Sequence, residues 1–127
     1  MAISDADRIV NEGNSMVYKA TLLDPDDVAI TEALIVSITL TLYDSGTGTI
    51  INSRNAQNVK NANQVTIHAT SGLLTWNALP ADSPIVSSVL PAGETEQHIA
   101  LFRVVYGGNK GLNHEVPISV KQLIKFT

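Results

Sequence analysis

The strongest constraint on the fold is a run of alternating side chains between positions 36 and 44. Apolar and hydroxyl-bearing residues alternate without a slip for four cycles, and a turn-forming cluster of Ser, Gly and Thr follows at positions 45–48. A period of two is typical of a β-strand with one buried face. The residues of this strand that we expect to face a core are Val36, Ile38, Leu40 and Leu42.

The same pattern recurs along the whole chain, and no segment has the period of a convincing helix. Turn signals rich in Gly, Pro, Asn and Asp separate the periodic segments. The strands expected are residues 8–12, 15–23, 34–44, 49–54, 64–69, 73–79, 96–106 and 112–123. Residues 56–63 read as a loop, and 80–93 as a long connection with one helical turn near 82–86. Phe102 and Val104 are expected in the core.

Seven or eight short strands with this patterning predict an all-β fold, a two-sheet antiparallel sandwich, with a closed barrel as the alternative. A chain of 127 residues fits one domain. We expect residues 1–13 to form an N-terminal arm or short edge strand, and residues 14–127 to form the sandwich. Pro117 cannot donate a backbone hydrogen bond, so its strand is expected at an edge or with a bulge.

Composition excludes several classes of partner. The net charge is −4 and the eight Lys and Arg are never adjacent, so a nucleic acid is not expected. No stretch approaches the roughly 20 apolar residues of a membrane span, and the first residues do not form a signal peptide. The absence of Cys removes disulfides and thiol chemistry and fits a protein made in a reducing cytosol.

No group of residues indicates a reaction, so no catalytic, cofactor-binding or metal-binding residue is expected and the chain is interpreted as a non-enzyme. A hairpin turn at 107–111 would place His114 opposite Val104 and on the order of 20 Å from His98, which makes a shared metal improbable. The third histidine, His68, is expected to be an ordinary strand residue. The acidic stretch 24–27 lacks the ligand spacing of a calcium loop and predicts a turn.

Segments 15–23, 24–27 and 38–52, the last with Ile-Thr-Leu-Thr-Leu-Tyr-Asp and Gly-Thr-Ile-Ile-Asn, resemble small immunoglobulin-like β-sandwich modules of tailed-bacteriophage virions. The similarity extends over about residues 14–123 and includes modules at the N-terminus of baseplate upper proteins. Those proteins usually continue beyond the sandwich, whereas this sequence stops at Thr127. The resemblance therefore implies a head decoration or neck protein, without a cofactor.

The resemblance implies a structural virion protein, made in the bacterial host cytoplasm, that binds other virion subunits in multiple copies. It would act as a capsid decoration or cement protein, or in the head–tail neck, with major capsid or neck and tail subunits as partners. The alternatives are a tail or baseplate adaptor and, from a different class, a carbohydrate-binding module. The residues expected to contact neighbouring subunits are Ile3, Ile9, Val10, Tyr43, Pro117, Leu123, Ile124 and Phe126.

Overall fold

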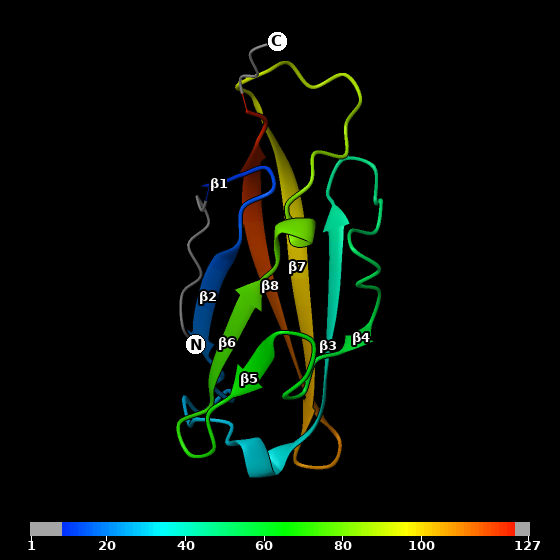
Figure 1. The fold of residues 1–127 in the computed structure, drawn as a ribbon. Helices are drawn as coiled ribbons and strands as arrows, with labels where there is room; N and C mark the ends of the chain where they lie inside the picture. The colour runs from blue at the N-terminus through cyan, green and yellow to red at the C-terminus, as the bar shows by residue number, and fades with distance from the viewer. Residues whose placement is uncertain (1–8, 124–127) are drawn as a thin grey trace.

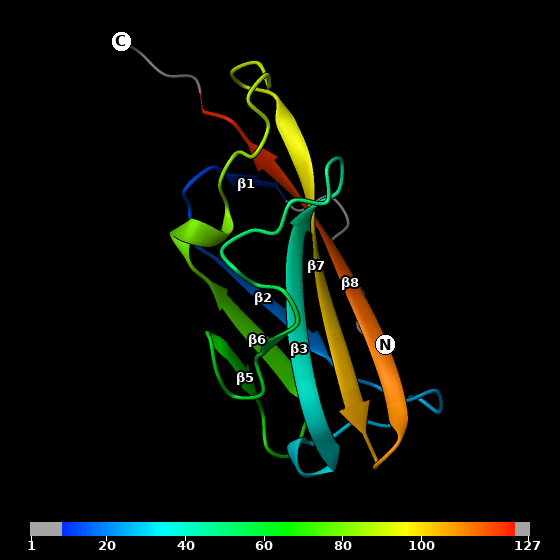
Figure 2. The same cartoon turned by 90° about the vertical axis from the view of Figure 1, so that its right-hand side faces the viewer.

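Two β-sheets packed face to face form the protein in the computed structural model, which describes residues 9–123 (Figures 1 and 2). The large sheet has the strand order β1-β8-β7-β3-β4, and the small sheet has the order β2-β6-β5. The strands are β1 (Ile9–Asn11), β2 (Met16–Thr21), β3 (Ile35–Asp44), β4 (Gln57–Asn58), β5 (Val65–Ile67), β6 (Leu73–Ala78), β7 (Thr95–Tyr106) and β8 (Lys110–Lys121).

The hairpin of β7 and β8 dominates the large sheet. Its ladder is uninterrupted from the Thr95–Lys121 pair to the Tyr106–Lys110 pair, and β3 pairs antiparallel with the other side of β7. The short strand β1 pairs with β8 in parallel, at Ile9–Ser119 through Asn11–Lys121, so the expectation of a wholly antiparallel sandwich is wrong at this one pair. All the other strand pairs are antiparallel.

The core fills the space between the inner faces of the two sheets. Trp76 of β6 packs edge-on against Phe102 of β7, with ring centroids 5.8 Å apart. Alternation predicted the buried positions correctly for Ile38, Leu40, Leu42, Phe102 and Val104. Most of the other buried hydrophobic residues are Val, Ile and Leu.

Val36 was expected in the core but is 58% exposed. The pairing of β3 with β7 shifts register between Ile35 and Ser37, which marks a bulge. A bulge inserts one extra residue and reverses the facing of the residues before it. Ile35 is therefore buried in place of Val36.

The expected strand at 49–54 does not form. Asn52 and Ser53 have positive φ angles of 53° and 57°, which break an extended chain, and only Ile50 makes a β-bridge, to Tyr43. The segment still covers the edge of β3, because the Ile51 N–H donates to the Leu42 carbonyl. The paired segment β4 lies instead in the stretch predicted as a loop.

Helical structure in residues 9–123 is confined to two single turns, η1 (Glu32–Leu34) and η2 (Pro80–Asp82). The second lies at the start of the long connection, close to the predicted helical turn. No helix in the described part of the chain is long and apolar enough to cross a membrane.

Gly72 allows the β5–β6 turn to pack closely against the backbone of Leu22 and Ile30. Its φ is +71°, and a Cβ atom at this position would lie 2.7 Å from the Ile30 carbonyl oxygen and 3.2 Å from that of Leu22. Both neighbours are backbone atoms that cannot move independently. The position therefore requires glycine for its conformation and for space.

Candidate functional site

Three cross-strand neighbours form an apolar row on the outer face of the large sheet. The register places Tyr43 of β3 beside Ile99 of β7, and Ile99 beside Pro117 of β8. Each is half-buried, whereas the next residues along these strands, such as Leu42 and His98, face the core. The fold thus brings together two of the predicted interface residues, and we call Tyr43, Ile99 and Pro117 the outer row.

The other predicted interface residues are not part of this row. Ile9 is 64% exposed in β1 and Leu123 is 40% exposed after β8. Val10 is buried in the core of this chain, because alternation along β1 turns it inward, so it is withdrawn as an interface residue. The remaining three, Ile3, Ile124 and Phe126, lie outside the described residues.

Pro117 lies in the part of β8 that has a strand on one side only. Among residues 9–123, β1 pairs with β8 at Ser119–Lys121 and no strand pairs with the outer edge of residues 110–118. The ladder with β7 is continuous through Pro117, so of the two arrangements expected for this residue the structure has the edge and not the bulge. A proline at an edge removes one donor and discourages pairing with another chain.

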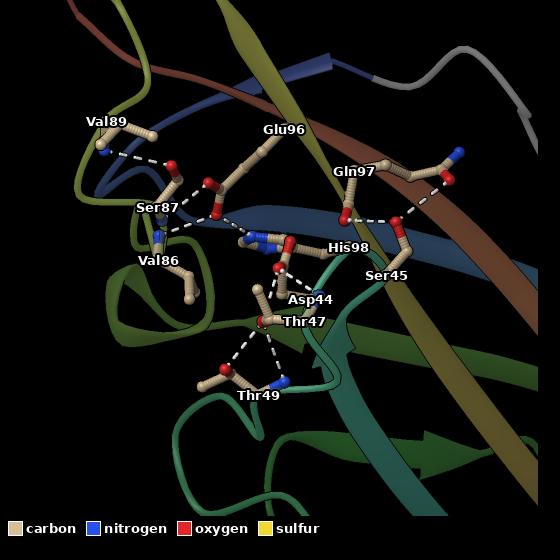
Figure 3. Close-up of polar contacts among 10 residues, drawn as sticks. All are labelled: Asp44, Ser45, Thr47, Thr49, Val86, Ser87, Val89, Glu96, Gln97 and His98. Carbon is tan, nitrogen blue, oxygen red and sulfur yellow. Dashed lines mark hydrogen bonds and ion pairs between the residues drawn. The ribbon is translucent and has the colours of Figure 1, made fainter.

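Three ionisable side chains converge inside one end of the sandwich, where β3 ends and β7 begins (Figure 3). Asp44 is the last residue of β3 and lies directly opposite His98 in β7. Glu96 precedes His98 by two residues and so projects from the same face of β7. One donor atom of each residue lies within 4.8 Å of the other two. We call Asp44, Glu96 and His98 the carboxylate–histidine cluster.

Hydrogen bonds from nearby loops hold both carboxylates in place (Figure 3). The Val86 and Ser87 backbone N–H groups donate to the two oxygens of Glu96, at 2.7 and 3.0 Å. Thr47 donates to Oδ2 of Asp44 through its backbone N–H and its hydroxyl, at 3.1 and 2.7 Å. The cluster therefore ties the turn after β3 and the connection 83–94 to the large sheet.

Within the cluster, Nε2 of His98 lies 2.5 Å from Oε2 of Glu96. The His98 side chain is fully buried, and its Nδ1 atom has no hydrogen-bond partner among residues 9–123. Buried polar atoms are nearly always paired, so this nitrogen is an exception that needs an explanation.

The other two histidines have different surroundings. His114 lies opposite Phe102, two positions from the predicted partner Val104, because the hairpin turn is shorter than expected. Its Nε2 lies 2.6 Å from the Tyr18 hydroxyl, and burial lowers the pKa of His114 below its usual 6.5. His68 is exposed, and its Nδ1 accepts hydrogen bonds from the turn that follows β5.

A second buried polar site joins the two long connections. Nε of Arg54 lies 2.6 Å from Oδ1 of Asp82, and Nη2 lies 3.0 Å from Oδ2, so the pair is bidentate. Both residues are almost completely buried. Asp82 also accepts a hydrogen bond from the Leu79 backbone N–H. Complete pairing of this kind points to a structural role in fixing the loops.

The acidic turn at 24–27 has the local structure expected of it. Oδ1 of Asp24 accepts hydrogen bonds from the backbone N–H groups of Asp26 and Val28, which is the pattern of an Asx turn.

The sequence reasoning missed the carboxylate–histidine cluster because it compared histidines only with one another. The Glu-x-His spacing at 96–98 was visible and places both side chains on one face of a strand. The third member, Asp44, comes from a strand more than 50 residues earlier. Its position depends on the pairing of β3 with β7, which the sequence analysis did not assign.

No protein-family model and no curated protein sequence matches this chain. The solved structures that are similar in fold include the following two. CopC from Methylosinus trichosporium OB3b is 14% identical, over 97% of this chain and 91% of that chain, with a TM-score of 0.49. The periplasmic chaperone SfaE is 9% identical over 94% of this chain, with a TM-score of 0.50, and the match spans 56% of the chaperone.

At this level of identity the comparison concerns the fold alone. Residues 9–123 form an immunoglobulin-like β-sandwich of eight strands; the patterning predicted the sandwich, and the resemblance implied the immunoglobulin-like type. These comparisons do not bear on the resemblance to phage modules, which remains a prediction.

Proposed function

We propose that this chain is a non-enzymatic structural subunit of a tailed-phage virion, which binds other virion subunits as a capsid decoration or head–tail neck component. The observation that carries the proposal is the outer row, three half-buried apolar side chains that cross three adjacent strands. In the next row on the same face, polar Thr41 of β3 and Glu115 of β8 flank the half-buried Leu101 of β7.

A partner would contact the face of the sheet at the outer row. Pro117 obstructs the alternative, in which a foreign strand extends the sheet at the open edge of β8. Apolar contacts would outweigh salt bridges, because charged residues are only 16% of the chain. A stable contact would bury more than about 1,000 Å² in total, so the outer row would be the centre of a larger interface.

The structure gives little support to the carbohydrate-binding alternative. A sugar platform needs exposed aromatic rings, yet Tyr18, Trp76, Phe102 and Tyr106 are buried. Tyr43 is the only aromatic side chain among residues 9–123 that reaches the surface, and it is half-buried. The tail or baseplate adaptor remains the second candidate within the virion class.

Particle analysis tests the proposal. Virions of the phage that encodes the chain are purified, and the chain is quantified by mass spectrometry and located by immunogold labelling. We expect multiple copies on the head or neck. Label on the tail or baseplate would favour the adaptor, and particles without the chain would overturn the virion assignment.

Matched substitutions on β7 test the interface. Ile99→Thr removes the centre of the outer row, whereas Val105→Thr makes a similar change on the same face, six residues away. We expect the first variant to be incorporated into particles at reduced occupancy and the second at the wild-type level, with both folded. Equal occupancy of the two variants would rule out the outer row as the binding surface.

Terminal deletions test the contribution that we expect from the ends of the chain. Removing residues 1–12 would delete β1 and take Val10 from the core, so a loss of incorporation would be ambiguous. Removing residues 1–8, or 124–127, leaves every described strand intact. We expect either deletion to weaken incorporation, and wild-type occupancy of both would exclude a role for these ends.

A further inference from the structure

We propose that Asp44, Glu96 and His98 form a binding site for one divalent transition-metal ion of the Zn²⁺ type. The site is independent of the outer row and of any virion partner. It rests on the placement of three ligand side chains, the loops that support them, and the lack of a lysine or arginine partner for either carboxylate among residues 9–123.

The backbone places the three donors on one surface. Asp44 and His98 are direct cross-strand partners, and Glu96 is on the same face of β7 as His98. One donor atom from each lies within 4.8 Å of the other two, although the three belong to separate positions on two strands. Small shifts of the side chains would bring these atoms to the distances of about 2.0–2.2 Å at which carboxylate oxygen and imidazole nitrogen bind Zn²⁺.

The set of donors selects the class of metal. One imidazole and two carboxylates would supply three protein ligands, the number in an open zinc site whose fourth position takes water or a substrate. Mg²⁺ and Ca²⁺ prefer shells made entirely of oxygen, so the imidazole disfavours them. Asp44 and Glu96 each retain slight exposure, which leaves a route from solvent.

The surroundings of the cluster resemble the outer shell of a metal site. Backbone N–H groups of Val86 and Ser87 orient Glu96, and Thr47 orients Asp44. Hydrogen bonds of this kind fix the ligands and tune affinity in metalloproteins. These hydrogen bonds come from two separate segments, the connection at Val86 and Ser87 and the turn at Thr47 (Figure 3).

The charge balance of the cluster also favours a cation. Within residues 9–123, no lysine or arginine forms an ion pair with Asp44 or Glu96, and His98 is the one basic group beside them. Two carboxylates held together in a poorly solvated place destabilise each other unless a positive charge lies between them. Nε2 of His98 already faces Oε2 of Glu96, so an ion between these two atoms and Asp44 would replace their direct contact.

Zn²⁺ titration of the full chain tests the proposal. Protein stripped with a chelator is titrated with Zn²⁺ by isothermal calorimetry, and its melting temperature is measured with and without the ion. We expect one ion per chain and a higher melting temperature, with much weaker responses to Mg²⁺ and Ca²⁺. The absence of Zn²⁺ binding would overturn the proposal.

Variants identify the ligands. Asp44→Asn and Glu96→Gln keep the size of each side chain, and His68→Gln removes an exposed histidine outside the cluster as a control. We expect the first two to weaken Zn²⁺ binding by at least about tenfold and the control to leave it unchanged. Loss of binding in His68→Gln, or equal binding in all three, would mean that the ion binds elsewhere.

Co²⁺ absorption gives a measurement that does not depend on the stability of the variants. Co²⁺ in a site with three protein ligands and water gives visible bands that Zn²⁺ removes by displacement. We expect these bands in the wild-type chain and in His68→Gln. A spectrum identical to that of Co²⁺ in buffer would contradict the proposed coordination.

Discussion

Two rows of residues cross the inner face of the large sheet, and each contains a histidine. In the first, Leu40 of β3 lies beside Phe102 of β7, which lies beside His114 of β8. In the second, four residues further along the sheet, Asp44 lies beside His98, which lies beside Ile118. All six side chains are buried. We call these the apolar row and the polar row.

The rows differ because different elements pack against them. The small sheet covers the apolar row, where His114 meets the Tyr18 hydroxyl and burial lowers its pKa. Loop backbone and carboxylates surround the polar row, where His98 contacts Glu96. Alternation along a strand determines whether a histidine side chain is buried. The element that packs over the sheet determines which groups that histidine contacts.

The largest effect is expected from a truncation in the apolar row. Leu40 is completely buried, so Leu40→Ala removes apolar contacts and leaves a cavity. We expect the free energy of unfolding to fall by about 2–5 kcal/mol, measured by urea denaturation. Thr41→Ala, on the outer face of the same strand, is the control and should change it far less. A loss below about 1 kcal/mol for Leu40→Ala would show that this row is loosely packed.

A smaller loss is expected from Glu96→Ala in the polar row. The change removes the acceptor for the Val86 and Ser87 N–H groups and the partner of His98. Leaving such donors unpaired costs about 1–3 kcal/mol. Hydrogen exchange should accelerate at these two amides more than at the amides of β8. Uniform acceleration over the whole sheet would indicate that Glu96 supports the fold as a whole and not the connection.

The lowered pKa of His114 also predicts a pH dependence of stability. Because the pKa of His114 is lowered in the folded state, the contribution of this residue is fully present above its unfolded pKa of about 6.5. It is lost as the pH falls below 6.5 through the lower folded-state pKa. His114→Gln should therefore flatten the decline in unfolding free energy over this range, measured by urea denaturation at several pH values. A decline as steep as that of the wild type would assign it to other groups.

The smallest effect on the free energy of unfolding is expected from a substitution at Thr47, in the turn next to Asp44 of the polar row. Thr47→Ala deletes the hydroxyl that donates to Asp44, but the backbone N–H of residue 47 still donates to the same oxygen. We expect a loss of about 1 kcal/mol in the free energy of unfolding. Ser45→Ala is a matched control in the same turn, since its hydroxyl bonds to Gln97 and not to Asp44. A loss in Ser45→Ala equal to or larger than the loss in Thr47→Ala would show that the support assigned to Thr47 is wrong.

The sequence predicted the strands well, because a half-buried strand records its environment in its own residues. The single period of 36–44 located β3, and the alternation of 96–106 located β7. The bulge at Ile35 was not predicted, because an extra residue at the start of a strand leaves no signal in the alternation. Likewise, the positive φ of Asn52 and Ser53 depends on tertiary contacts of the loop that covers β3.

The carboxylate–histidine cluster and the outer row were harder to predict from the sequence, because both depend on which residues of neighbouring strands are paired. The predicted turn at 107–111 is two residues longer than the turn in the structure. His114 was therefore expected opposite Val104, whereas it lies opposite Phe102. The outer row required the same information, and so Tyr43 and Pro117 were predicted separately without the link through Ile99. Cross-strand chemistry becomes predictable once the pairing of distant strands is known.

The most direct test of the difference between the rows is a long-range ¹H–¹⁵N spectrum of the imidazole rings, recorded on the full chain during Zn²⁺ titration. The ring nitrogens of all three histidines are observed in one experiment. The account predicts that signals of His98 shift and saturate at one ion per chain, while those of His114 and His68 stay unchanged. Shifts at His68 or His114 with none at His98, or no shift in any ring, would contradict it.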